Sequence, residues 1–150
     1  NKDFYSLEKY KKNEFKNKER FLIISTYNFY EKFRPTFSSI IEEISKLLNN
    51  NEDFIIILLG AKAKKEINYN IFLEKKIREF FKDTRILNLT GKLSIKNSMD
   101  IISQSHQYIG ANNGLANVAQ MLNIKCKLIF NGPENFEKRK FSSNAKFKSL

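Results

Sequence analysis

Short apolar runs recur along the chain, separated by longer stretches of mixed polarity. Five such runs lie at residues 21–25, 54–59, 85–89, 107–111 and 126–130. Runs of this length that are apolar at most positions are typical of strands buried on both faces of a sheet. The pattern therefore predicts five buried strands.

Between these runs, apolar residues return at the spacing of a helix. The clearest case is 37–48, where the apolar positions 40, 41, 44, 47 and 48 share one face behind Pro35, a residue favoured in the first turn of a helix. Similar spacing predicts helices at 71–81, 95–103 and 115–122. Strands that alternate with helices imply parallel pairing and right-handed crossovers. We expect an α/β domain: a Rossmann-like, doubly wound, mostly parallel five-stranded sheet with helices on both faces.

The composition fits one folded domain with a basic surface. Of the 150 residues, 41% are hydrophobic, which is enough for one buried core. Lys and Arg number 27 against 16 Asp and Glu, so the net charge is +11. This balance favours anionic partners such as nucleotides, phosphorylated sugars, acidic lipid surfaces or nucleic acid. Heavy use of Lys, Asn, Ile and Phe is also typical of AT-rich coding, so charge alone does not choose among these partners.

Several classes of protein find no support in the sequence. The single cysteine, Cys126, lies in an apolar run, so a disulfide framework is excluded and a buried thiol is expected. There is no apolar run long enough to span a membrane and no signal-like start, so we expect a cytoplasmic protein. Because the sequence opens on Asn1 and ends in a Lys-rich stretch, we expect a piece of a longer protein. Its parts would be a lead or linker at 1–19, the domain at 20–135 and a basic tail at 136–150.

The segment most suggestive of a ligand is the loop at 110–119, Gly-Ala-Asn-Asn-Gly-Leu-Ala-Asn-Val-Ala. It joins a predicted strand to a predicted helix. In an open α/β sheet, such a loop presents unpaired N–H groups and the positive end of the helix dipole, and phosphate is a common occupant. The Gly-x-Gly-x-x-Gly motif is absent, which argues against an ordinary dinucleotide-binding domain.

Other polar features have plainer interpretations. His106 lies just before this loop in the sequence, and we expect a surface or capping role for it in preference to a ligand role. The lysines at 62, 64 and 65 could steer an anionic ligand, although a hydrated turn is the favoured interpretation. The basic triplet at 138–140 could touch anionic lipid, with a solvated tail again favoured.

Four segments, in the same order, resemble the C-terminal half of the heptosyltransferase family of GT-B glycosyltransferases. They are Lys-Phe-Arg-Pro at 32–35, Asn-Leu-Thr-Gly-Lys-Leu-Ser at 88–94, Asn-Asn-Gly-Leu-Ala-Asn at 112–117 and Phe-Asn-Gly-Pro at 130–133. The resemblance covers residues 20–135 and implies a nucleotide-sugar-binding domain. It also implies a second, N-terminal domain that carries the acceptor and the catalytic carboxylate.

Carried over by position, the resemblance implies donor-binding roles for Lys32, Glu66, Asn112, Asn113, Gly114, Leu115, Asn117 and Gly132. Lys32 would lie near the diphosphate, the Gly114 turn would hold phosphate with main-chain N–H groups, and Glu66 would contact the ribose. The three asparagines replace Asp, Ser or Thr, and His of the family pattern. An Asn in place of Asp keeps an acceptor but loses the charge, and an Asn in place of His cannot titrate near neutral pH.

The resemblance predicts the donor half of an inverting GT-B glycosyltransferase that acts in bacterial lipopolysaccharide, lipooligosaccharide or related surface-glycan synthesis. It implies a nucleotide-sugar donor, a glycan or glycolipid acceptor held by the other domain, no cofactor and no metal, and it would suit peripheral contact with the inner face of the membrane. The asparagine replacements leave open a non-catalytic nucleotide-binding module of the same fold. Nucleic-acid binding is a third hypothesis that rests on charge alone. We expect no nucleic-acid partner, because the aromatic residues occupy apolar runs and are not interleaved with basic residues for stacking on bases. The base, the sugar, the acceptor and the oligomeric state are not encoded in these patterns.

Overall fold

The computed structural model describes residues 20–49, 54–130 and 145–149. Six strands form one parallel sheet in the order β3-β2-β1-β4-β5-β6. The strands are β1 (Arg20–Ser25), β2 (Phe54–Leu58), β3 (Arg85–Asn88), β4 (Gln107–Gly110), β5 (Lys125–Phe130) and β6 (Ala145–Ser149). The first five agree with the predicted strands to within one residue at each end. The α/β class and the parallel sheet are thus confirmed.

The sixth strand adds to the expected sheet. β6 pairs in parallel with β5 and lies inside the range 136–150, which the sequence suggested was a tail. Its sequence, Ala-Lys-Phe-Lys-Ser, contains no apolar run that would reveal a strand. Its place in the sheet comes from backbone pairing with a neighbour, which a local sequence pattern does not show.

The helices are α2 (Phe37–Leu48), α3 (Lys64–Phe80), α4 (Ile95–Ser103) and α5 (Gly114–Met121), with a short 3-10 helix, η1 (Glu31–Phe33), before α2. α2 and α4 match the prediction. α3 begins at Lys64, well before the expected start at residue 71, because its first turns bury Asn70 where an apolar residue would have marked the helix. Asn70 Nδ2 donates there to Thr90 Oγ1 at 2.7 Å, whereas the buried Asn70 Oδ1 meets no hydrogen-bond donor among the described residues.

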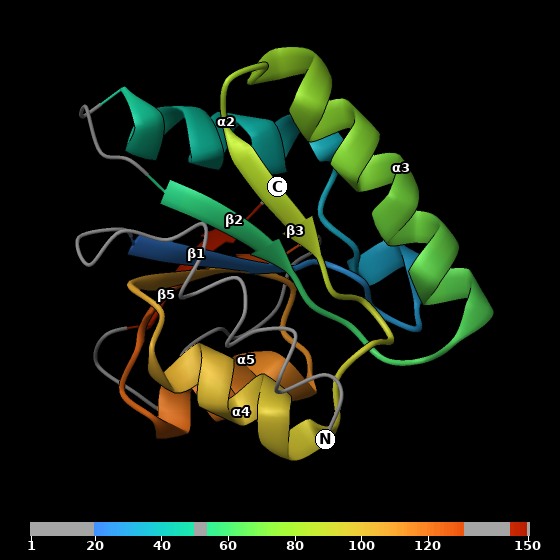
Figure 1. Ribbon diagram of the computed structural model, residues 1–150, viewed down its shortest axis with the longest axis vertical. Helices are drawn as coiled ribbons and strands as arrows, with labels where there is room; N and C mark the ends of the chain where they lie inside the picture. Colours follow the sequence, from blue (N-terminus) through green and yellow to red (C-terminus); the bar gives the residue numbers. More distant parts are fainter. Residues whose placement is uncertain (1–19, 50–53, 131–144, 150) are drawn as a thin grey trace.

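The sheet is covered on both faces, with α2 and α3 on one side and α4 and α5 on the other (Figure 1). Successive residues of a strand point to opposite faces, so Leu22 and Ile24 of β1 pack in the cluster that contains Ile40 of α2. Ile23, between them, packs in the opposite cluster with Ile101 of α4. The buried apolar runs of the sequence therefore fill two cores, one on each side of the sheet.

Side chains from the loops begin three of the helices. Thr36 accepts a hydrogen bond from Ser39 N at 3.2 Å and caps α2, and Pro35 lies just ahead of this cap rather than in the first turn. Ser94 caps α4 in the same way, and Asn113 caps α5. These caps fix where each helix leaves the edge at which the strands end.

The expected burial of Cys126 is confirmed. Its side chain is in the cluster beneath α4 and α5, and burial raises the pKa of the thiol to about 12. No helix in the described part of the chain is long and apolar enough to cross a membrane.

Candidate functional site

The sheet order places a topological switch point between β1 and β4. From β1 the chain adds β2 and β3 on one side, and it then returns to the other side of β1 with β4, β5 and β6. The loops that follow β1 and β4 therefore run in opposite directions. A crevice opens between them at the carboxyl ends of the strands. A cleft of about 650 Å³ lies there.

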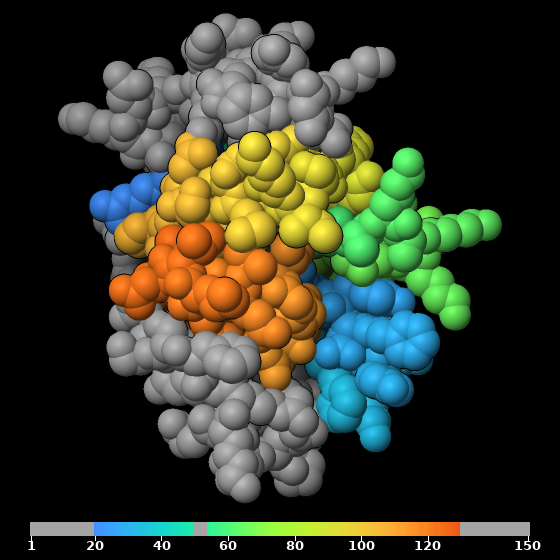
Figure 2. Space-filling model, turned by 90° about the horizontal axis from the view of Figure 1, so that it is seen from below, coloured from blue at the N-terminus to red at the C-terminus, as the bar shows by residue number. Residues whose placement is uncertain are grey.

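Three loops line this cleft. The first follows β1, the second follows β2 and includes the start of α3, and the third joins β4 to α5. The lining residues are Ser25, Tyr27, Asn28 and Phe29, then Ala61, Ala63, Lys64, Lys65 and Glu66, and finally Asn113, Gly114 and Leu115. Figure 2, viewed from the side of α4 and α5, shows the first crossover in blue and the start of α3 in green meeting beside α5 in orange.

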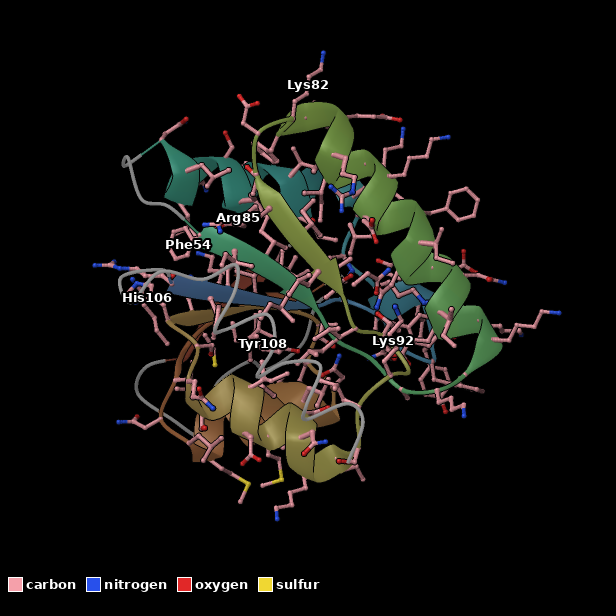
Figure 3. The ribbon with its side chains drawn as sticks, viewed as in Figure 1. Phe54, Lys82, Arg85, Lys92, His106 and Tyr108 are labelled. Carbon is pink, nitrogen blue, oxygen red and sulfur yellow. The ribbon has the colours of Figure 1, made fainter. Side chains whose placement is uncertain are left out.

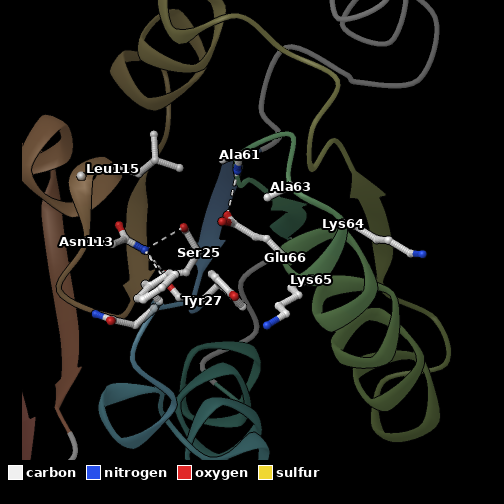
Figure 4. A pocket seen from close by; sticks show the side chains of 12 residues that line it. Ser25, Tyr27, Ala61, Ala63, Lys64, Lys65, Glu66, Asn113 and Leu115 are labelled. Atoms are coloured by element: carbon white, nitrogen blue, oxygen red, sulfur yellow. Dashed lines mark hydrogen bonds between the residues drawn. The ribbon is translucent and has the colours of Figure 1, made fainter.

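Asn113 fixes the shape of the third loop. Its Oδ1 accepts from Ala116 N at 3.1 Å, and its Nδ2 donates to Tyr27 O at 3.1 Å and to Ser25 Oγ at 3.1 Å (Figure 4). The Tyr108 hydroxyl lies 3.0 Å from Asn113 Oδ1 and 3.1 Å from Ser25 O. One amide thus caps α5 and ties its start to β1, so this side chain is used to hold the site together.

The first N–H groups of α5 are left free for a ligand. Ala116 N is taken by Asn113 Oδ1 and Asn117 N by Asn113 O, but the N–H groups of Gly114 and Leu115 meet no acceptor among the described residues. A Cβ added at Gly114 would lie in open space. Two amides and the positive end of a helix dipole therefore face the cleft without a side chain in front of them, an arrangement that suits an anion.

Glu66 faces the cleft from the first turn of α3. Its Oε2 accepts from Ala61 N at 2.7 Å. Burial raises the pKa of this carboxyl above its usual value, while the Ala61 hydrogen bond and the charge of Arg34 act in the opposite direction. A half-buried carboxylate with one oxygen engaged can accept a hydrogen bond from a hydroxyl group of a ligand through its other oxygen.

Arg34 was not among the predicted site residues, yet it holds the β1 loop. Its Nε donates to Asn28 O at 2.7 Å, and its guanidinium lies 4.2 Å from the centre of the Tyr27 ring and 5.7 Å from that of Tyr69. Tyr69 comes from α3, so Arg34 joins the first crossover to the start of the second. Its position in Lys-Phe-Arg-Pro was the only sequence signal, because Tyr69 lies far away along the chain.

The structure brings Glu66, Asn113, Gly114 and Leu115 together in the cleft. Lys32 is placed otherwise: it is exposed on η1, its Nζ lies 4.9 Å from the centre of the Phe33 ring, and it does not line the cleft. The loop that bears it is nonetheless next to the α5 loop, since Asn28 Nδ2 lies 3.5 Å from Asn112 O. Both stretches are therefore at the same edge of the sheet, as expected.

The remaining predicted positions lie around the cleft or outside the description. Asn112 and Asn117 are half-buried and are not among the lining residues, although both flank the start of α5. Gly132 falls outside the described residues, as do 138–140.

His106 lies away from the candidate loop, although it is close to it in sequence. It precedes β4, at the amino edge of the sheet, and its ring packs 5.6 Å from that of Phe54 (Figure 3). His106 and the loop lie at opposite ends of β4. A ligand role for His106 in this cleft is therefore excluded. Among the described residues, no group of three or more His, Cys, Asp or Glu could hold a metal ion.

Comparisons with known proteins agree on the fold. No protein-family model matches the sequence, and no curated protein matches it. The structure is similar to that of E. coli ADP-heptose lps heptosyltransferase II, with a TM-score of 0.72, 13% identity and coverage of 97% of this chain and 42% of that one. A family 9 glycosyl transferase from Veillonella parvula gives a TM-score of 0.72 at 9% identity, with coverage of 100% and 41%.

The heptosyltransferase WaaC of E. coli, solved with ADP, is also similar. The TM-score is 0.68 at 13% identity, and the match covers 95% of this chain and 41% of WaaC. The chain thus spans about two fifths of the length of the solved structures that it matches. At these identities the likeness establishes the fold, and the fold is that of heptosyltransferase structures, as the sequence resemblance implied.

Proposed function

We propose that this chain binds the nucleoside diphosphate of a sugar donor, as the donor half of a heptosyltransferase-like GT-B glycosyltransferase. The observation that carries the proposal is the pair of free N–H groups of Gly114 and Leu115, which face a cleft at the switch point of the sheet. A similar structure was solved with ADP, and another with an ADP-linked 2-deoxy-2-fluoro heptose. A diphosphate on α5 and a ribose on Glu66 would fit the same cleft.

The chemistry follows from this placement. When a glycosidic bond to a nucleoside diphosphate breaks, negative charge grows on the departing phosphate. Fixed N–H dipoles at α5 would stabilise that charge with little reorganisation, because Asn113 already holds them in place. The acceptor and the catalytic carboxylate would come from a second domain, with inversion at the anomeric carbon and a product in a bacterial surface glycan, as in lipopolysaccharide synthesis.

A non-catalytic nucleotide-binding module is the second candidate. The observation in its favour is that Asn112 and Asn117, which flank the start of α5, are neutral amides where the family pattern has Asp and His. Both candidates predict nucleotide binding, and they differ in turnover. A longer protein with the partner domain that binds a donor without hydrolysing or transferring it would favour the module.

The variant Gly114→Asp, which introduces a negative charge at the start of α5, tests the proposal. The new side chain meets open space, and a carboxylate in the first turn of a helix stabilises that helix, so the fold is expected to be as stable as the parent or slightly more so. The same carboxylate repels phosphate. We expect calorimetric titration with ADP, GDP and UDP to show an affinity at least about tenfold lower than the parent's for whichever of the three binds.

Ile95→Asp is the matched control. It places the same charge at the first residue of α4, where Ile95 is 80% exposed and does not line the cleft. Its affinity should match the parent's. Failure of the parent to bind any of the three nucleotides, or equal loss in the two variants, would argue against an anion site at α5.

A further inference from the structure

The cleft has a cation that the resemblance did not assign to it. Lys65 lies in the first turn of α3 and lines the cleft next to Glu66. In Figure 4 its side chain reaches from α3 toward Tyr27, whereas that of Lys64 extends to the far side, away from Ser25 and Asn113. Both lysines line the cleft, but their side chains point in different directions, and that of Lys65 is the one that reaches toward Tyr27.

Two further cations near the cleft, Arg34 and Lys32, are engaged elsewhere. The Arg34 guanidinium donates to Asn28 O and stacks on Tyr27, so its position is fixed within the loop. The Lys32 ammonium lies over Phe33, outside the cleft. Lys65 has no hydrogen bond or ion pair with any described residue.

A diphosphate needs such a charge. The N-terminus of a helix offers roughly half an elementary charge, which is less than a nucleoside diphosphate carries at neutral pH. α5 supplies amides from the β4 side of the cleft, and α3 begins on the β2 side. A cation on the second wall would complete the neutralisation and hold the diphosphate between the two helices.

We propose that Lys65 binds the diphosphate of the donor from the wall opposite α5. This inference rests on the proposed function and extends it, because it places part of the anion site on α3, outside the segments of the family pattern. Lys65 would hold the charge of the departing phosphate together with the N–H groups of Gly114 and Leu115.

The test compares Lys65→Gln with Lys75→Gln, a control at an exposed lysine of α3 that does not line the cleft. Both variants remove one charge from α3 and introduce the same polar side chain, so net charge changes equally and helix propensity changes little. Each variant is titrated with a nucleoside, its monophosphate and its diphosphate, using the base that binds the parent best. We expect Lys65→Gln to weaken diphosphate binding about tenfold while nucleoside affinity is unchanged. Lys75→Gln should stay within about twofold of the parent.

Salt dependence gives a second measurement. Removing a cation that contacts phosphate should flatten the fall of diphosphate affinity with salt in Lys65→Gln, and the slope should be retained in Lys75→Gln. Equal losses in the two variants would show a diffuse effect of net charge and overturn the inference. So would unchanged diphosphate affinity in Lys65→Gln.

Lys32→Gln separates this inference from the family pattern. Because Lys32 lies outside the cleft, its loss should weaken diphosphate binding less than that of Lys65. The reverse order would assign the cation to η1 and contradict our proposal. If the parent protein binds none of the nucleotides, the proposed function itself fails, and that outcome is distinct from a failure confined to Lys65→Gln.

Discussion

Asn113 shows how much one side chain can decide at the residue scale. It accepts from Ala116 N, donates to Tyr27 O and Ser25 Oγ, and lies beside the buried Tyr108 hydroxyl. The family pattern has Ser or Thr here, either of which could cap α5 but could not donate to two carbonyl or hydroxyl oxygens of the β1 loop. The replacement therefore keeps the cap and adds a tie between two loops.

Substitutions at Asn113 should separate its role as the cap of α5 from its role in joining α5 to the β1 loop. Asn113→Ser keeps a cap acceptor and loses the tie, so we expect a loss of about 1 kcal/mol in the free energy of unfolding. Asn113→Ala loses both and should cost about 2 kcal/mol or more. Urea denaturation of the parent and the two variants measures the order of their free energies of unfolding. Equal stabilities for Ser, Ala and the parent would show that the amide contributes no net stability.

Glu66 gives a pH-dependent prediction. Burial is the main cause that raises the pKa of its carboxyl above the usual 4.5. The folded state then holds the proton more tightly than the unfolded state, so the associated stability is complete below the unfolded pKa and is lost as the pH rises through the folded value. At neutral pH the ionised carboxylate is a cost to folding.

Glu66→Gln should remove that cost, because a Gln oxygen can still accept from Ala61 N. We expect the variant to be at least as stable as the parent at about pH 7, with the difference in stability vanishing at about pH 4. If Glu66 contacts the ribose, nucleoside affinity should fall in the same variant. Chemical denaturation at the two pH values checks the first expectation, and a variant less stable than the parent near neutrality would contradict it.

At the element scale, the site depends on how closely β4 approaches β1. Gly110 ends β4 beside Ser25, and a Cβ there would overlap the Ser25 carbonyl oxygen and press on the Tyr108 hydroxyl. Backbone atoms cannot move aside as a flexible side chain can. The two strands can therefore bring their loops together only with glycine at this position.

Gly110→Ala should destabilise the protein by about 2 kcal/mol or more, as overpacking against fixed atoms does. Gly114→Ala is the matched control, because its Cβ meets open space and Ala favours a helix more than Gly does. Thermal and urea unfolding should show a clear loss in the first variant and no loss in the second. Similar stabilities would mean that β1 and β4 can separate without cost.

The elements themselves were largely predictable. The spacing of apolar residues predicted the strands and the limits of α2 and α4, because each of these elements buries a regular set of apolar residues. It missed the first turns of α3, which bury Asn70 in place of an apolar residue, and it missed β6. Both failures have one cause, since the partner that satisfies each element is remote in sequence.

At the scale of the whole molecule, strand order sets a gradient of protection. β1 and β4 lie within the sheet with a strand on each side, whereas β3 and β6 form its edges. Amide groups of central strands open only when large parts of the fold do, and those of edge strands open by local fluctuation.

Hydrogen exchange should follow this order. We expect amides of β1 and β4 to exchange about tenfold or more slowly than those of β3 under native conditions. Exchange followed by NMR measures each strand separately. If β3 were protected as strongly as β1, it would not behave as an edge, and the order of strands would need revision. Binding of a nucleotide should slow hydrogen exchange most at the amides of Gly114 and Leu115.

The site was predictable in part. The loop before α5 was found from its sequence because a small polar turn between an apolar strand and a helix has a local signature. The association of Arg34 with Tyr27 and Tyr69 was not, and neither was the position of Lys65 in the cleft. Such contacts depend on which turn of one crossover lies beside which turn of another.

The sequence by itself determined the elements, the two apolar faces of the sheet and the free helix start at Gly114, because these depend on residues near one another in the chain. Tertiary structure decided which loops meet. Strand order joins residue 25 to residue 113 and brings 34 to 69, so the composition of the cleft, the separation of Lys32 from it and the entry of Lys65 were settled only when the strands paired. Pairing across the sheet is a long-range choice, and no local pattern records it.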